Sequence, residues 1–142
     1  MSTHPFKSSD SSGVYFLPPA RLIATEAAAG KERLRILKAE ISAHADRDKA
    51  LGQLGTDLGF PIWYGGNFDA LFDCLTDSDW QPAKGHVLVI RGVAELRSTD
   101  PESFSTLIEV FRAAADVRKE AGSPFWILLD TPARGIPPLP EA

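Results

Sequence analysis

Cysteines and long apolar segments are almost absent from this sequence of 142 residues. Its single cysteine, Cys74, cannot form a disulfide bond within the chain, which fits a reducing compartment. No apolar run approaches the ~18 residues that typify a membrane-spanning helix. The polar start "MSTHPFKSSDSSG" has no apolar core like that of a signal peptide. We therefore expect one soluble, cytoplasmic domain.

Basic residues are missing from the segment between Lys49 and Lys84. Because the net charge is −4 for the whole chain and −5 for this segment, the rest of the chain carries +1. An acidic segment repels phosphates, which argues against direct nucleic-acid binding there and favours a cationic partner. The acidic residues of the segment are Asp57, Asp69, Asp73, Asp77 and Asp79.

Motifs of catalytic, metal and cofactor sites are also missing. There is no G-x-S-x-G motif and no P-loop, and "YGGN" (64–67) lacks the pattern of a dinucleotide-binding loop. The histidines at positions 4, 44 and 86 do not have the spacing of metal ligands. We predict a protein that is not an enzyme and needs no cofactor or metal.

Short apolar segments alternate with helical patterns along most of the chain. The patterns predict strands at 13–17, 34–41, 86–92 and 125–130, and helices at 20–30, 47–59, from about 68, and at 101–122. The last two strands are almost continuously apolar, as is typical of strands covered on both faces of a parallel sheet. The alternation predicts an α/β fold, with a small parallel sheet of three to four strands packed with helices.

The two ends of the chain differ from this pattern. Residues 1–12 are polar, and we expect them to be a disordered tail. Residues 131–142, "TPARGIPPLPEA", contain four prolines, which predicts an extended and poorly ordered tail. The domain itself is therefore expected at 13–130.

The acidic segment contains the run "IWYGGNFDALFDCL" (62–75). We expect Asn67 to be the N-cap of a helix, because its side chain can accept a hydrogen bond from the first turn. At about 100° per residue, Asp69 and Asp73 share the face opposite to the apolar one. The apolar face, expected to face the core, consists of Phe68, Leu71, Phe72 and Leu75.

Several of these residues have both a structural and a functional interpretation. Asp69 is favoured near a helix N-terminus by the helix dipole. Asp73 forms a like-charge pair with Asp69 that costs an isolated helix a few tenths of a kcal/mol, so it belongs to a solvated face or to a binding site. Two carboxylates could also serve a glycosidase, but one solvent-facing turn rarely makes the pocket needed. The aromatic residues Trp63, Tyr64 and Trp80 can be core anchors or exposed contacts.

The longer run "FPIWYGGNFDALFDCLTDSDW" (60–80) resembles the signature of the barstar family, intracellular inhibitors of the ribonuclease barnase. The resemblance extends more loosely from about Leu34 to Leu129, and residues 13–33 resemble an extra strand and helix of longer bacterial members. It implies a barstar-like fold and an antitoxin-like protein that protects the cell. Such a protein blocks the cationic active site of a basic ribonuclease, one to one, with an acidic helix and loop that mimic RNA phosphates.

By match with the family motif, the resemblance implies roles for individual residues. Asp73 corresponds to the central carboxylate and Asp69 to its partner, while Trp63 corresponds to the aromatic contact of the loop. The implied nuclease-binding residues are Trp63, Tyr64, Gly65, Asn67, Asp69, Phe72, Asp73 and Trp80, with Asp77 and Asp79 as further acidic candidates.

The sequence departs from the family pattern near this motif. The acidic contact on the family's last helix corresponds to Ala113, and Gly66 replaces an acidic residue beside the turn. Two extra residues before Trp80 introduce Asp77 and Asp79, which we hypothesise restore the lost charge. Changes at the rim of an interface alter partner choice. The alternative is therefore a barstar-fold interaction module with a non-nuclease partner.

Overall fold

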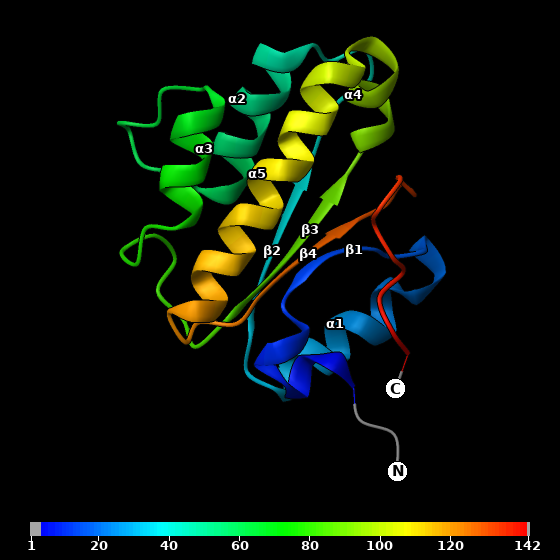
Figure 1. The fold of residues 1–142 in the computed structure, drawn as a ribbon, viewed down its shortest axis with the longest axis vertical. Coiled ribbons are helices and arrows are strands. Elements are labelled where there is room, and N and C mark those ends of the chain that lie inside the picture. The colour runs from blue at the N-terminus through cyan, green and yellow to red at the C-terminus, as the bar shows by residue number, and fades with distance from the viewer. Residues whose placement is uncertain (1–3, 142) are drawn as a thin grey trace.

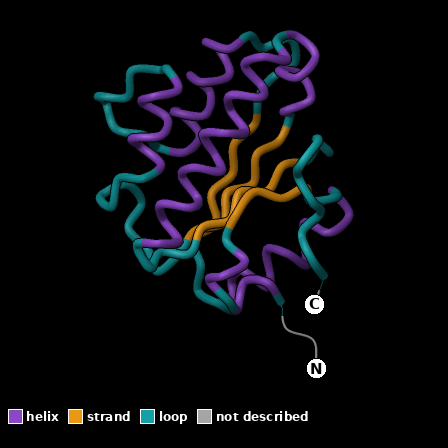
Figure 2. Tube along the Cα trace, viewed as in Figure 1, coloured by secondary structure: helices purple, strands orange, loops and turns teal. Residues whose placement is uncertain are grey.

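A computed structural model describes residues 4–141, and within them four strands form one parallel sheet in the order β1-β4-β3-β2 (Figures 1 and 2). The strands are β1 (Gly13–Phe16), β2 (Arg35–Glu40), β3 (His86–Arg91) and β4 (Phe125–Leu129). The α/β fold with a small parallel sheet, predicted from the alternation of patterns, is confirmed.

Helices cover both faces of the sheet (Figure 1). The chain crosses the sheet from β1 to β2 and then returns stepwise through β3 to β4. Because crossovers between parallel strands are right-handed, the two directions place their helices on opposite faces. One face carries α1 (Leu22–Lys31), and the other carries α2 (Arg47–Leu58), α3 (Phe68–Leu75), α4 (Val93–Thr99) and α5 (Pro101–Glu120).

Each face of the sheet has its own hydrophobic core. The core under α2 to α5 is the larger and includes Leu54, Leu71, Phe111, Leu88 and Ile127. The core under α1 contains Ala29, Val87, Val89, Trp126 and Leu128. The central strands β3 and β4 contribute to both cores, which explains their continuous apolar sequences.

The segment before β1 differs from the expected disordered tail. Phe6 is only 4% exposed, and its ring packs edge-on against Trp126 at 5.0 Å between centroids. The indole N–H of Trp126 donates to Ser11 Oγ at 3.1 Å. The segment forms two 3₁₀ turns, Pro5–Lys7 and Ser9–Ser11. The Phe6 side chain thus anchors this otherwise polar segment to the sheet. Residues 1–3 of the expected tail lie outside the described residues.

The proline-rich segment after β4 also differs from the expected poorly ordered tail, because it lies against the edge strand β1. Phe16 N–H donates to the Pro137 carbonyl, and Leu139 N–H donates to the Phe16 carbonyl, both at 2.9 Å. Leu139 is 1% exposed, and Arg21 donates to its carbonyl at 2.6 Å. Prolines are compatible with the edge of a sheet, where some N–H groups need no partner.

Two helices differ from the sequence-based prediction. The predicted helix at 20–30 continues through Gly30 to Lys31, and the chain turns only at Arg33, which has a φ of 58°. Helix α4 was not predicted, because its seven residues are too few to establish a helical periodicity. Within residues 4–141, no helix has both the length and the apolar character needed to cross a membrane.

Candidate functional site

Helix α3 begins where the sequence predicts. The Asn67 side-chain oxygen accepts a hydrogen bond from Ala70 N–H at 2.7 Å and so caps the helix. Leu71 and Leu75 are fully buried, while Phe68 and Phe72 are only half-buried. The apolar face is therefore divided: one part packs into the core, and two aromatic rings lie at its border.

Asp69 and Asp73 lie on the exposed side of α3, as predicted. Neither carboxylate forms a hydrogen bond or an ion pair with any other residue in the part of the chain that the structure describes. Their helix is held by its cap and its core contacts, and Asp69 in the first turn adds only a favourable interaction with the helix dipole. Both carboxylates are available to a cationic group from outside.

The other acidic residues of the segment are partly used within the protein. Asp57 accepts a hydrogen bond from Glu40 N–H at 2.9 Å and so ties α2 to β2. Asp77 accepts from Asp79 N–H at 2.9 Å and shapes the turn after α3, while Asp79 itself is exposed. Within residues 4–141, the exposed carboxylates of this segment that accept no hydrogen bond are therefore those of Asp69, Asp73 and Asp79.

A buried cation below α3 was missed by the sequence analysis. Arg118 comes from α5, is 6% exposed, and donates 2.8 Å hydrogen bonds to the carbonyls of Leu75 and Asp77. Its guanidinium also lies over the rings of Trp80 and Phe125, 5.9 and 5.5 Å from their centroids. Arg118 thus fixes the end of α3, and its hydrogen bonds go to backbone carbonyls and not to the aspartates.

The aromatic residues of the motif separate into exposed and buried groups. Trp63 is 53% exposed on the loop before α3, and its neighbour Ile62 is fully exposed. Tyr64 turns inward: its hydroxyl donates to the Leu51 carbonyl at 2.8 Å, and its ring lies against Gly55. Burial raises the pKa of Tyr64 to about 12. Trp63 is therefore a candidate contact residue, whereas Tyr64 anchors the loop.

The assignment of Trp80 to the binding surface was wrong. Trp80 is 4% exposed, and its indole N–H donates to the Leu58 carbonyl at 2.8 Å. Its ring stacks on His86, with centroids 5.7 Å apart and planes 10° apart. The turn after α3 folds this side chain back into the core, which spacing along the sequence cannot show.

Cys74 is completely buried. Burial, followed by the negative charges of Asp73 and Asp77, raises the pKa of its thiol to about 11. The thiol is therefore inert at neutral pH. Residues 4–141 contain no group of three or more His, Cys, Asp and Glu side chains arranged to hold a metal ion.

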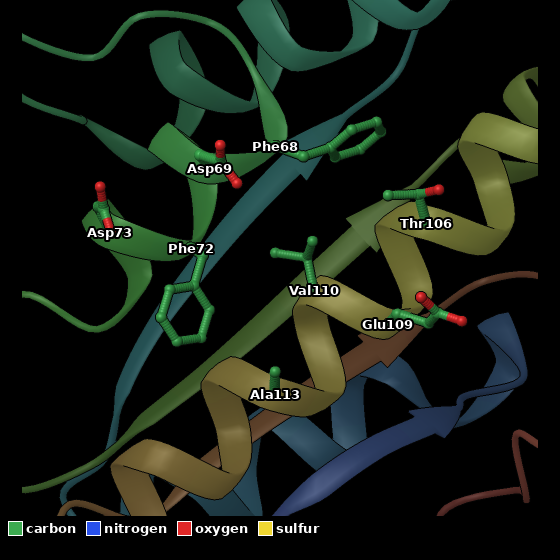
Figure 3. A pocket seen from close by; sticks show the side chains of 8 residues that line it. All are labelled: Phe68, Asp69, Phe72, Asp73, Thr106, Glu109, Val110 and Ala113. Atoms are coloured by element: carbon green, nitrogen blue, oxygen red, sulfur yellow. The ribbon is translucent and has the colours of Figure 1, made fainter.

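A groove of about 530 Å³ lies between α3 and α5, beside the acidic face (Figure 3). Helix α3 contributes Phe68, Asp69, Phe72 and Asp73, and helix α5 contributes Thr106, Glu109, Val110 and Ala113. The residues from α5 and the exposed Ile62 were not among the sequence-based candidates. The amphipathic pattern at 101–122 indicated that Glu109 lies on the polar face of a helix. No local pattern indicated that this part of the helix lies beside α3.

The comparison with protein families fits this geometry. The family described as "Barstar (barnase inhibitor)" matches residues 34–130, which is most of the chain. The chain belongs to the barstar family. The barstar match includes β2 to β4, α2 to α5 and the whole acidic surface, and it leaves out β1, α1 and the C-terminal segment. The description of this family gives inhibition of barnase as the activity of its members. No curated protein matches the sequence significantly.

Proposed function

We propose that this protein inhibits a basic ribonuclease by covering its active site, in a one-to-one complex, with α3 and the preceding loop. The observation that supports this most directly is the pair of exposed carboxylates without a partner, Asp69 and Asp73, within the region matched by the barstar family. The partner is a protein, and neither nucleic acid nor membrane takes part. The inhibitor would protect the cytoplasm of the cell that makes it.

The charge arrangement suits an active site that binds RNA. Asp69 and Asp73 are four residues apart in one helix, so their side chains are neighbours on its surface. A ribonuclease holds the phosphates of its substrate with cationic side chains, and two neighbouring carboxylates offer those cations similar partners. Opposite charges on two proteins also speed their association, an effect for which the barnase–barstar complex is itself the standard example.

The surface is also organised before binding. The Asn67 cap, the Tyr64 hydroxyl and the Arg118 guanidinium each fix part of the loop, the helix or the following turn. Less conformational entropy is then lost when the partner binds. Trp63 and Ile62 lie exposed on the loop and can exclude water around the carboxylates.

The test is inhibition of RNA cleavage by barnase and by a panel of basic microbial ribonucleases. We expect the wild-type protein to inhibit at least one of them stoichiometrically. Asp73→Ala should weaken inhibition by at least about 30-fold, the loss that defines a binding hot spot. Its melting temperature should stay the same or rise slightly, because a like-charge repulsion is removed.

Unfolding of the Asp73→Ala variant would instead make this aspartate a structural residue and remove the main support for an inhibitor. Ala113 and Gly66, which replace acidic residues of the family pattern, favour a second candidate: a barstar-fold interaction module with a non-nuclease partner. A pull-down from the source organism, with wild type beside an Asp69→Ala, Asp73→Ala double variant, separates the two. A basic nuclease lost by the double variant supports the inhibitor, and a non-nuclease partner held by both supports the module.

A further inference from the structure

A pocket of about 270 Å³ lies on the sheet face opposite to the acidic surface, between the start of α1 and the carboxyl ends of β3 and β4. In open parallel sheets, ligands bind outside the carboxyl ends of the strands, where neighbouring connections leave towards opposite faces. Here the chain leaves β1 towards α1 and leaves β3 towards α4, and β4 lies between the two strands. The pocket therefore has the position of a site for a small molecule.

The lining of the pocket combines apolar side chains with charged ones, among them Leu17, Leu22, Val89, Leu128, Arg91 and Asp130. The ladder between β3 and β4 continues with a hydrogen bond from Asp130 N–H to the Ile90 carbonyl at 3.2 Å. Arg91 and Asp130 thus occupy neighbouring positions on strands about 4.8 Å apart. Because alternate residues of a strand share a face, both side chains lie beside the apolar floor.

Hydrogen bonds hold the Asp130 carboxylate in place but leave its charge unpaired. Its oxygens accept from Gly92 N–H at 2.9 Å and from the Thr131 hydroxyl at 3.1 Å. Each oxygen has a second lone pair for a further donor. Within residues 4–141, no cationic side chain forms an ion pair with this carboxylate. Asp130 is therefore a fixed acceptor for a cationic group of a ligand.

The guanidinium of Arg91 is available to an anionic group. Among the described residues it forms an ion pair with Glu40, at an N–O distance of 3.9 Å that is too long for a hydrogen bond. The Arg91 side chain is 57% exposed. A guanidinium binds a carboxylate with two parallel hydrogen bonds, which an incoming acid would offer in place of this long contact.

Few small molecules satisfy both charges and the apolar floor. A purely apolar ligand would desolvate Arg91 and Asp130 without pairing them. An acid without an amino group would bring a like charge to Asp130, and an amine without an acid group would leave Arg91 unpaired. A phosphate group is also a poor fit, because Pro18 and Pro19, directly after β1, have no N–H groups to bind it.

We propose that this pocket binds a free α-amino acid with an apolar side chain of the size of leucine. Its carboxylate pairs with Arg91 and its ammonium group with Asp130. Both groups are attached to one carbon atom, so they can contact side chains on adjacent strands together. The apolar side chain lies on the floor formed by Leu17, Val89 and Leu128. This inference does not depend on the proposed function, because the pocket lies on the other face of the sheet.

The first test is a titration of the isotope-labelled, full-length protein with L-leucine, followed by two-dimensional NMR. We expect a dissociation constant of about 1 mM or lower, with shifts at the amides of Leu22, Val89 and Asp130 and none on α3. The matched probes are isocaproate, which is leucine without its amino group, and isoamylamine, which is leucine without its carboxylate. Each should bind at least about tenfold more weakly, because hydrogen bonds between charged groups are lost.

The second test changes the protein. Arg91→Gln should weaken the binding of leucine at least about tenfold, but it should bind isoamylamine at least as well as the wild type does. Arg35→Gln is the matched control, because it removes the same charge from an exposed position at the amino end of β2. Salt screens a charge at that distance, so Arg35→Gln should change leucine binding by less than about twofold.

The outcomes separate this inference from the proposed function. If leucine at about 10 mM causes no shifts around the pocket, the inference is wrong. If isocaproate binds as tightly as leucine, or if Arg91→Gln binds leucine like the wild type, the assignment to an amino acid is wrong. The Asp69→Ala, Asp73→Ala double variant should bind leucine like the wild type, whether or not it has lost the inhibition of a ribonuclease.

Discussion

The three aromatic residues of the acidic segment have three different environments. Trp63 is exposed, Tyr64 is half-buried with a hydrogen-bonded hydroxyl, and Trp80 is buried with a hydrogen-bonded indole. From the sequence pattern alone, each of the three could be either a core anchor or an exposed contact residue. Their chemical types are similar, and only the path of the backbone before and after α3 decides which ring meets solvent.

Replacing these tryptophans should therefore have opposite effects. Trp80→Ala should lower the free energy of unfolding by about 3–5 kcal/mol, because it leaves a cavity between Leu58, His86 and Arg118. Trp63→Ala should change it by less than about 0.5 kcal/mol but weaken binding to the ribonuclease. Urea denaturation measures the first quantity and inhibition the second. Equal stability losses for both variants would contradict the assigned environments.

The thiol of Cys74 gives a prediction about pH. Its pKa is raised from an ordinary value of 9.0 to about 11 in the folded protein. Above pH 9 the unfolded chain loses this proton first, so rising pH favours unfolding. The contribution of the thiol to stability is complete below pH 9 and is lost as the pH approaches about 11.

Urea midpoints measured from pH 8 to 10.5 should thus fall more steeply for the wild type than for Cys74→Ala. Iodoacetamide at pH 9 should modify Cys74 slowly in the folded protein and rapidly in urea. Rapid modification of the folded protein would show that the thiol is accessible.

At the scale of elements, a side chain of α5, Arg118, binds the carboxyl end of α3. Arg118 lies 43 residues after Leu75 and donates to its carbonyl, and it also binds the carbonyl of Asp77. Carbonyls at a helix C-terminus have no partner within the helix, and a cation there is favoured by the helix dipole. The position of the acidic turn therefore depends on a helix that is distant in sequence.

Removing this cation should loosen the turn. Arg118→Met keeps much of the apolar stem but leaves two carbonyls without donors, so we expect a loss of about 2–3 kcal/mol in the free energy of unfolding. Arg118→Lys should recover part of it, because the charge returns without the planar group. The measurements are urea denaturation and amide hydrogen exchange at residues 76–80. Unchanged exchange in Arg118→Met would show that the turn is held by other contacts.

At the scale of the whole molecule, the N-terminal segment and α1, which lie outside the family match, form one layer. They cover the sheet face opposite to the acidic surface, whereas β1 extends the sheet beside β4 (Figure 1). Beneath them lie Trp126, Val87, Val89 and Leu128. This layer therefore supports the sheet, and the binding surface is built without it.

Weakening this layer should affect stability and leave binding intact. Phe6→Ala removes the ring that packs on Trp126 and should cost about 3 kcal/mol or more. Below its melting temperature, the variant should inhibit the ribonuclease with nearly wild-type affinity, because the acidic surface lies on the other face. Deletion of residues 1–33 should expose the core under α1 and cause binding of a hydrophobic dye. A deletion variant as stable as the full chain would contradict this role.

Local patterns in the sequence determined the elements and the acidic face. The periodicity of apolar residues placed the strands and most helices, and Asn67 placed the start of α3, because these signals act between residues close in the chain. The placement of Asp69 and Asp73 on one exposed face followed from helical geometry alone. The family resemblance of residues 60–80 was likewise a property of the sequence.

Tertiary structure decided the contacts between distant segments. It brought Arg118 beneath α3, placed Glu109 and Ala113 beside Phe72, and buried Trp80. It also fastened the segments before β1 and after β4, within residues 4–141, to the sheet. None of these contacts has a local pattern, because each depends on how whole elements pack after the chain has crossed the sheet. The sequence alone thus determined which charges are exposed, and the packing of elements decided what surrounds them.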